Sequence, residues 1–258
     1  MDYIENHYTN YDEEARLERK HGMVEFLTTM RYIEKYLQPG AHVLEIGAGT
    51  GRYSRAIADM GYKVEAVELV PHNIEVFRKL TTETQDIRIT QGNALDLNMF
   101  VDNLFDITLM FGPMYHLYTE ADKHQAISEA LRVTKPGGVV FVAYVISDVA
   151  ILEGLNGWFV DYVAKGKINP ATFETTSEPE DIFELVRKED IDRLMAQFQA
   201  ERLHYVAIDM ISRLLRESLA VMSEEAFELY LKYHFAICER ADMVGLTSHS
   251  LDIFRKGV

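Results

Sequence analysis

The chain has 258 residues and a formal net charge of −15 at pH 7, because 41 acidic residues outnumber 26 basic ones. This balance disfavours nucleic-acid binding, which requires a positively charged surface. The single cysteine, Cys238, excludes a disulfide within the chain and any metal or redox centre built from several cysteines.

The length allows one enlarged α/β domain with a sizeable core, and the sequence contains no internal repeat or long low-complexity tract. The longest uninterrupted apolar stretch, Val139–Ile146, is far too short to cross a bilayer. The first twenty residues are acidic and polar, unlike a signal peptide. We therefore expect a cytoplasmic protein that has no membrane partner.

Residues 1–40 precede the first predicted strand and form an arm. The later part of this arm predicts an amphipathic helix that ends at Gln38-Pro39-Gly40. Its apolar face carries Phe26, Met30, Ile33 and Leu37. Aromatic and basic side chains are dense ahead of that helix: Tyr3, Tyr8, Tyr11, Arg16, Arg19 and His21.

A glycine-rich turn, VLEIGAGTGR at residues 43–52, joins a buried strand to a helix. Glycine is needed where the backbone takes positive φ or lies flat against a ligand. Such a turn leaves the free N–H groups of a helix start facing the crevice where doubly wound sheets bind nucleotides. The dinucleotide fingerprint G-x-G-x-x-G would need glycine at position 52, where this chain has Arg52.

Further strands follow at regular intervals. The second, Lys63–Leu69, carries Glu68 at its end, where a carboxylate can accept hydrogen bonds from both hydroxyls of a ribose. The third, Ile87–Thr90, leads into GNALD, and the fourth, Phe105–Phe111, opens into Gly112-Pro113-Met114-Tyr115-His116.

The next helix is framed by a capping box, Thr119 to Asp122, and stops at Lys135-Pro136-Gly137-Gly138. A fifth strand, Val139–Ile146, follows at once. Strands that alternate with helices at this pitch predict a parallel sheet with helices on both faces. Beyond it, residues 147–200 form an insertion, and residues 211–243 predict a helical addition with Ser223 as an N-cap.

Five motifs together resemble the class I S-adenosylmethionine-dependent methyltransferases. They are EIGAGTG, the acidic strand end at Glu68, GNALD, FDITLMFGPMYHL and LRVTKPGG, in the family's order and at its usual distances. The resemblance implies a doubly wound α/β fold with a seven-stranded sheet, mostly parallel with an antiparallel last strand. Residues 203–208 and 251–255 are then the candidates for strands six and seven.

The resemblance also divides the chain, taken as one domain of residues 1–258, into four parts. These are an N-terminal helical arm (1–40), a cofactor-binding half (41–146), a helical lid insertion (147–200) and C-terminal strands and helices (201–258).

Carried over position by position, the resemblance implies a site for S-adenosylmethionine and its product S-adenosylhomocysteine. The glycines would turn over the methionine part, and Glu68 would hold the ribose. Asn93 stands where the family often has aspartate, and its side-chain oxygen can still accept from the adenine amino group. The cofactor candidates are Tyr11, Arg16, Glu45, Gly47, Ala48, Gly49, Gly51, Glu68, Leu69, Asn93, Ala94, Phe111 and Gly112.

On the acceptor side, the resemblance points to Tyr115 and His116, just after the fourth strand, under a lid that carries Trp158 and Phe159. The unperturbed pKa of histidine, near 6.5, allows His116 to act as a general base. Each of these residues could equally serve a purely structural role, as buried histidines and tyrosines commonly do. We expect no metal, and a monomer or a homodimer.

The expected reaction is in-line transfer of a methyl group from S-adenosylmethionine to a small-molecule acceptor. Three alternatives stay open: an RNA or protein methyltransferase, a regulatory protein that binds S-adenosylmethionine without turnover, and a nucleotide-dependent oxidoreductase. The acidic balance and the Gly-Pro-Met-Tyr end of the fourth strand disfavour methylation of bases. Arg52 in place of the third fingerprint glycine disfavours the oxidoreductase.

Overall fold

A computed structural model gives the structure of this protein and describes residues 2–9, 17 and 19–257. Its sheet comprises β1 (His42–Ile46), β2 (Lys63–Glu68), β3 (Ile87–Gln91), β4 (Phe105–Met110), β5 (Thr134–Ile146), β6 (Leu185–Val186), β7 (Ala200–Ala207) and β8 (His249–Lys256). The helices before β5 are α1 (Asp2–Thr9), α3 (Lys20–Tyr36), α4 (Arg52–Asp59), α5 (Pro71–Leu80), the 3₁₀ turn η1 (Pro113–His116) and α6 (Glu120–Val133). Those after β5 are α7 (Ser147–Gly154), α8 (Phe159–Ala164), η2 (Pro179–Asp181), α9 (Lys188–Met195), α10 (Arg216–Ala220) and α11 (Glu224–Ile237).

The strand order is β3-β2-β1-β4-β5-β8-β7, with β6 paired to β5. All pairs are parallel except the two that β8 makes, with β5 and with β7. The predicted doubly wound sheet with an antiparallel last strand is therefore confirmed. The sheet reverses direction along the chain between β1 and β4, and ligands bind at such a switch point in open α/β sheets.

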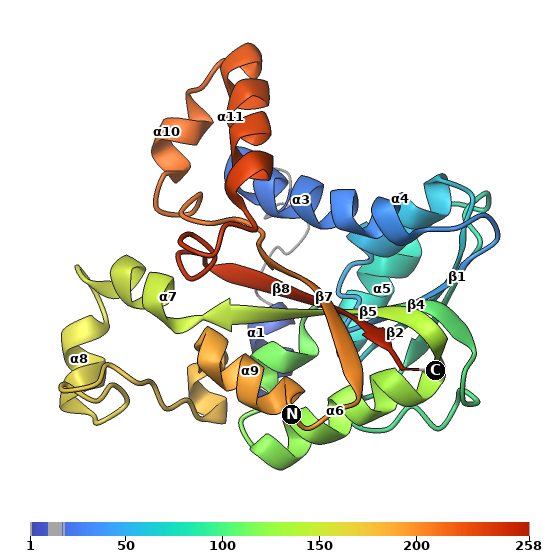
Figure 1. The fold of residues 1–258 in the computed structure, drawn as a ribbon, viewed down its shortest axis with the longest axis horizontal. Helices are drawn as coiled ribbons and strands as arrows, with labels where there is room; N and C mark the ends of the chain where they lie inside the picture. The colour runs from blue at the N-terminus through green and yellow to red at the C-terminus, as the bar shows by residue number, and fades with distance from the viewer. Residues whose placement is uncertain (1, 10–16, 18, 258) are drawn as a thin grey trace.

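Alternate residues of each strand pack on opposite faces of the sheet, as the pleat requires. Val43 joins the core cluster beneath α3 and α4, whereas Leu44 and Ile46 join the cluster beneath α6. Helices α3, α4 and α5 lie over one face, and α6 and α9 lie over the other (Figure 1). Burial on both faces explains why the strand sequences read as nearly continuous apolar runs.

The helix starts predicted from the sequence are confirmed. The Thr119 hydroxyl accepts a hydrogen bond from the Asp122 backbone N–H over 3.1 Å at the start of α6. The Ser223 hydroxyl accepts from Ala226 over 3.2 Å and caps α11. Helices α10 and α11 project from one end of the sheet, beside the start of α3 (Figure 1).

The insertion differs from a simple lid. It contributes the short strand β6 to the edge of β5 and the helix α9, whose Ile191 and Leu194 are buried against the α6 side of the core. Of the insertion's helices, α7 and α8 extend away from the sheet (Figure 1). Among residues 2–9 and 19–257, no helix combines the length and apolar character needed to cross a membrane.

Candidate functional site

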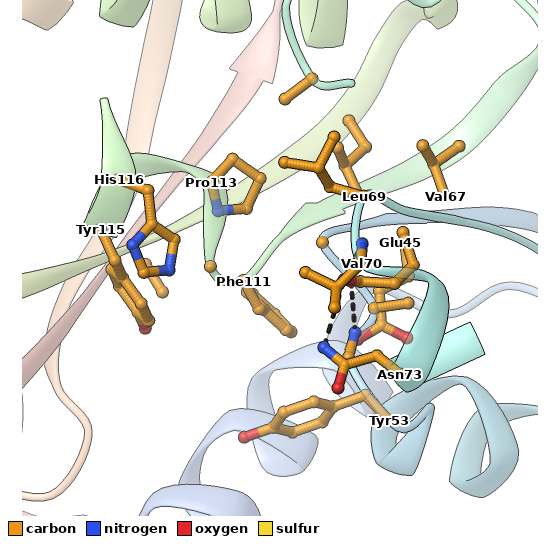
Figure 2. A pocket seen from close by; sticks show the side chains of 18 of the residues that line it. Glu45, Tyr53, Val67, Leu69, Val70, Asn73, Phe111, Pro113, Tyr115 and His116 are labelled. Carbon is orange, nitrogen blue, oxygen red and sulfur yellow. Dashed lines mark hydrogen bonds between the residues drawn. The ribbon is translucent and has the colours of Figure 1, made fainter. Parts of the chain in front are cut away.

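A cavity of about 300 Å³ opens at the carboxyl ends of the central strands. Figure 2 shows Glu45, Leu69 and Asn73 on one side of it, and Tyr115 and His116 on the other. Of the described candidates for the cofactor site, those that line the cavity are Glu45, Gly47, Ala48, Gly49, Glu68, Leu69, Asn93, Ala94, Phe111 and Gly112.

The three glycines of the turn all have positive φ, but they are needed for different reasons. A Cβ on Gly47 would lie 2.5 Å from the Pro113 ring, and one on Gly51 would lie 2.5 Å from the ring of Phe77. A Cβ on Gly49 would meet nothing within 4 Å. Gly49 alone of the three therefore faces open space, as a glycine does where the backbone must lie against a ligand.

The expectation that Gly51 contacts the cofactor is not supported by its position. Gly51 is the left-handed N-cap of α4 and does not belong to the cavity lining. Its missing side chain instead lets α4 approach α5 at Phe77, which is fully buried. The physical reason for glycine here is close packing between two helices.

Glu45 is the last residue but one of β1 and is 1 % exposed. Its carboxylate accepts hydrogen bonds from the backbone N–H and the hydroxyl of Ser54, the third residue of α4. It therefore satisfies an N–H at the helix start that has no partner within the helix. Burial raises the pKa of Glu45 to about 7, although the hydrogen bonds from Ser54 oppose this shift.

Glu68 ends β2 and holds the turn in place. One of its oxygens accepts from the Gly49 N–H over 2.8 Å, and the other accepts from the Val70 N–H over 2.9 Å and the Asn73 amide over 3.2 Å. Burial raises the pKa of Glu68, and hydrogen bonds from these three donors and from the Leu69 backbone oppose the rise. A carboxylate has about four acceptor sites, so Glu68 can still receive a ribose hydroxyl.

The loop after β3 supplies Asn93 and Ala94. The Asn93 side-chain oxygen accepts from the Leu95 N–H over 3.0 Å, and its backbone oxygen accepts from Asp96 over 3.0 Å. Asn93 thus shapes the loop as well as lining the cavity. Its side-chain oxygen keeps a second lone pair for an adenine amino group.

At the opposite end, His116 is held by two hydrogen bonds. Its Nδ1 lies 2.8 Å from the Ile182 carbonyl oxygen, and its Nε2 lies 2.9 Å from the Tyr8 hydroxyl. Because a carbonyl oxygen only accepts, Nδ1 carries the proton, and Nε2 of the neutral ring accepts from Tyr8. Burial lowers the pKa of His116 to about 4. The ordinary histidine pKa expected from the sequence is therefore wrong for this environment.

Two segments that are distant in sequence meet at His116. From α1, Tyr8 bonds to it, and His7 packs its ring 5.5 Å from that of Phe183. From the insertion, the Ile182 carbonyl receives both His116 and the Tyr118 hydroxyl. Ile182 has a φ of 69°, which is strained for a β-branched residue. Such strain persists where the surrounding structure fixes the backbone, commonly at functional sites.

The predicted lid residues lie elsewhere. Trp158 lines a second cavity of about 200 Å³ and packs its ring 4.6 Å from that of Tyr162. Neither Trp158 nor Phe159 belongs to the lining of the first cavity. The insertion reaches Tyr115 and His116 through residues 182–184 instead, where the Glu184 N–H bonds to the Tyr115 carbonyl over 2.6 Å. The candidates Tyr11 and Arg16 lie outside the described residues.

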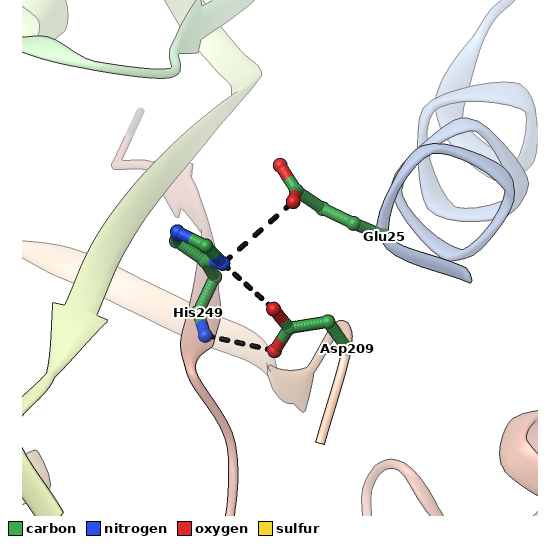
Figure 3. Close-up of side chains that lie close together, drawn as sticks. All are labelled: Glu25, Asp209 and His249. Atoms are coloured by element: carbon green, nitrogen blue, oxygen red, sulfur yellow. Dashed lines mark hydrogen bonds and ion pairs between the residues drawn. The ribbon is translucent and has the colours of Figure 1, made fainter. Parts of the chain in front are cut away.

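Sequence reasoning missed a buried group beside this end of the cavity, formed by Glu25, Asp209 and His249 (Figure 3). The His249 Nδ1 lies 2.7 Å from an Asp209 oxygen and 3.6 Å from a Glu25 oxygen. One ligand atom from each residue lies within 4.8 Å of the others, a spacing that a metal ion could bridge. The three positions are too far apart in the chain for any spacing motif to show them.

Known proteins similar to this chain include methyltransferases. Residues 44–142 match the family model described as a methyltransferase domain. A demethylmenaquinone methyltransferase from Renibacterium salmoninarum is 39 % identical over 106 residues, which are 41 % of this chain and 41 % of that protein. A 2-methyl-6-phytyl-1,4-hydroquinone methyltransferase from Synechocystis is 33 % identical over 108 residues, 42 % of this chain and 33 % of that protein.

The fold is similar to that of a solved structure, a SAM-dependent methyltransferase from Methanosarcina mazei. The TM-score is 0.60 at 16 % identity, and the match covers 88 % of this chain and 97 % of the other. The chain thus matches about two fifths or less of the length of the two curated relatives, whereas the fold extends over nearly its whole length. Residues 44–142, which contain all five motifs, therefore match a methyltransferase domain, in agreement with the resemblance that the motifs indicated.

Proposed function

We propose that this protein is a class I methyltransferase, which transfers a methyl group from S-adenosylmethionine to a small-molecule acceptor. The observation that carries the proposal is one continuous cavity that joins two kinds of lining. The turn around Gly49 and the carboxylate of Glu68 lie at one end, and Tyr8, Tyr115 and His116 lie at the other. Because a Cβ on Gly49 would enter open space, the backbone there fits a ligand that lies flat against it.

The residues at the first end suit the cofactor in chemistry as well as in shape. Glu68 offers acceptor sites for ribose hydroxyls, and Leu69 and Ala94 offer apolar surface and a backbone N–H for an adenine. The bound sulfonium supplies a methyl group that is already electrophilic. The protein then needs chiefly to align the acceptor and exclude water, and good alignment lowers a barrier by roughly 7–11 kcal/mol.

We further propose that the acceptor's proton leaves through Tyr8 and His116. The Tyr8 hydroxyl donates to Nε2 of His116, so its oxygen can accept a proton from the acceptor as its own proton passes to the imidazole. The lowered pKa keeps His116 neutral across the physiological range, so Nε2 carries no proton of its own, and the same shift makes the ring a weaker base than an ordinary histidine. A general base typically contributes a factor of about 10²–10⁴ when an acceptor must lose a proton. Tyr115 lines the cavity beside it and would orient the acceptor.

The names of the curated relatives point to acceptors of the quinone and hydroquinone class. This likeness covers the cofactor end and, at the acceptor end, Tyr115 and His116, but the family match ends at residue 142, before Ile208 and Leu251, which also line the acceptor end. We therefore propose a small-molecule acceptor without carrying over the quinone itself. The cavity, about 300 Å³, lies at the lower end of the range for small-molecule sites, roughly 300–1,000 Å³.

The test is calorimetry with S-adenosylhomocysteine, with a nicotinamide dinucleotide as the control ligand. We expect micromolar affinity for the former, on the order of −8 kcal/mol, and no binding of the latter. Binding of the dinucleotide alone would overturn the proposal.

A second measurement follows label from methyl-tritiated S-adenosylmethionine in a cell extract. Label in the low-molecular-mass fraction supports a small-molecule acceptor, and label in the protein or RNA fraction supports those alternatives. S-Adenosylhomocysteine binding with no transfer to any fraction would favour a regulatory protein.

A further inference from the structure

The acceptor end of the cavity contains a buried carboxylate, Glu25, on helix α3. Its side chain is one of those that line the cavity, and the residue is 5 % exposed. Through His249, Glu25 lies on the β8 side of the sheet, whereas Glu68 lies at the end of β2. Four strand-to-strand steps separate β2 from β8, on the order of 19 Å at about 4.8 Å per step. Glu25 is therefore well removed from the ribose-binding carboxylate.

Glu25 lies beside an ion pair between His249 and Asp209 (Figure 3). Asp209 accepts from the His249 side chain over 2.7 Å, and its other oxygen accepts from the His249 backbone N–H and the Thr247 hydroxyl, each over 2.8 Å. Burial alone would raise the pKa of Asp209, but the charge and hydrogen bonds of His249 outweigh burial and hold that pKa below its usual range. His249 thus pairs its Nδ1 with Asp209 and lies within ion-pair distance of Glu25, 3.6 Å from one of its oxygens.

Thr29 supplies a second polar group on the same face of α3, one turn after Glu25. It is 1 % exposed and lines the cavity, and its hydroxyl has no hydrogen-bond partner among the described residues. The neighbouring Thr28 hydroxyl, in contrast, donates to the Val24 carbonyl over 2.6 Å. Buried hydroxyls are nearly always hydrogen-bonded, so the Thr29 hydroxyl points to a ligand group that completes it.

We propose that Glu25 and Thr29 bind the amino group of the methyl acceptor, and that this protein therefore methylates small primary or secondary amines. This inference rests on the proposed function above. An amine offers N–H donors to both the carboxylate and the hydroxyl oxygen, whereas an acidic group would meet Glu25 with like charge. An alcohol can donate its one O–H to Glu25 and accept from the Thr29 hydroxyl, but it brings no positive charge to the buried carboxylate, so a protonated amine is the better partner.

The transfer step balances with these groups and the proton path proposed above. The bound ammonium group first loses one N–H proton through Tyr8 to His116, which frees the nitrogen lone pair. That lone pair forms the new N–C bond as the S–C bond breaks, and the electron pair of the broken bond stays on sulfur. Glu25 keeps its negative charge and binds the positively charged nitrogen, while Asp209 and His249 act on the reaction only through Glu25.

The experiment compares three acceptors of matched shape, 2-phenylethylamine, 2-phenylethanol and 3-phenylpropionate, on the full chain saturated with S-adenosylhomocysteine. We expect the amine to bind about tenfold more tightly than either analogue, because its charge-assisted hydrogen bond is the stronger one. Glu25→Gln should remove this preference and leave S-adenosylhomocysteine affinity unchanged. Glu34→Gln, an exposed glutamate on the same helix, is the matched control and should retain the preference.

Thr29→Val keeps the shape of the side chain and covers the case in which Glu25→Gln does not fold. It should weaken amine binding while cofactor affinity is retained. Equal binding of the amine and the alcohol by the wild type would overturn the inference. An equal loss of S-adenosylhomocysteine affinity in Glu25→Gln would also overturn it, because Glu25 would then meet the cofactor. If the wild type binds no S-adenosylhomocysteine, the proposed function itself fails, and that outcome is separate from these.

Discussion

Gly51 and Phe77 lie so close together that a Cβ on the glycine would come within 2.5 Å of the phenylalanine ring. Gly49, two residues earlier, has an equally left-handed backbone but open space beside it. The turn thus separates two requirements that look identical in the sequence. Gly51 serves the packing of α4 on α5, and Gly49 serves the cavity. Substitutions at the two positions should therefore fail in different ways.

Gly49→Val should abolish S-adenosylhomocysteine binding while the protein stays folded. The branched side chain enters the cavity and resists positive φ, where an ordinary residue loses about 1–2 kcal/mol. Gly40→Val is the matched control, because Gly40 also has positive φ and open space but does not line the cavity. Thermal unfolding should show similar losses for both variants, and calorimetry should show lost binding only for Gly49→Val. Normal binding by Gly49→Val would mean that the turn is not the site.

Gly51→Val should unfold or severely destabilise the protein, because its side chain collides with a fully buried ring. Overpacking of this kind typically costs about 1–3 kcal/mol, to which the strain of positive φ adds. Circular dichroism during thermal unfolding is the direct measurement. A Gly51→Val variant as stable as Gly40→Val would contradict the packing role.

Glu68→Ala should weaken binding of both S-adenosylmethionine and S-adenosylhomocysteine by about tenfold or more. The substitution removes the ribose acceptor and also leaves the Gly49 and Val70 N–H groups without their partner. Glu65→Gln is the control, since Glu65 lies on the same strand, is buried, and does not line the cavity. Calorimetry that finds equal affinities for the Glu68→Ala and Glu65→Gln variants would remove Glu68 from the site.

The sequence predicted most of the sheet because its strands are buried on both faces, and apolar runs bounded by glycine turns are easy to find. The two-residue strand β6 could not be predicted, because two residues carry no periodicity. Residues 211–243 were predicted as one helical addition, and the structure divides it into α10 and α11 around the Ser223 cap.

The two ends of the cavity also differ in how far the sequence could predict them. The cofactor end is built from residues close to one another along the chain, so a local pattern such as EIGAGTG carries much of the information. The acceptor end brings together Tyr8, His116 and Ile182, and separately Glu25, Asp209 and His249. Those contacts arise only when α1, α3 and β8 are placed around the sheet. Trp158 was assigned to the lid from its position in the insertion, and the structure places it in the second cavity.

The pKa of Glu45, raised by burial to about 7, predicts a pH dependence of folding stability. Between the ordinary value near 4.5 and about 7, the folded state binds more protons than the unfolded state, so stability falls as pH rises through this window. Glu45→Gln removes the titrating group and keeps an oxygen that can accept from Ser54. Denaturant unfolding at several pH values should show the variant gaining stability relative to wild type from pH 5 to 7. A constant difference across that window would show that Glu45 does not titrate there.

The hydrogen bond between Tyr8 and His116 can be tested through the pKa of His116 and then through the turnover of variants. His116 should titrate with a pKa of about 4, because its ring is buried and its neutral form is already paired on both nitrogens. An NMR titration of its ring resonance, assigned with the His116→Gln variant, measures this value directly. A midpoint near 6.5 would show a solvated ring and contradict the arrangement.

Tyr8→Phe and His116→Ala should each lower turnover by about tenfold or more, which corresponds to about 1.4 kcal/mol in the barrier. S-Adenosylhomocysteine affinity should change little in either variant, because both side chains lie at the acceptor end. The two losses should not add in the double variant, since both residues act in one proton path. The ring of His116 is neutral between pH 5 and 7, so its titration should cause no change in wild-type turnover across that range. Additive losses, or full turnover in Tyr8→Phe, would show that the proton leaves by another route.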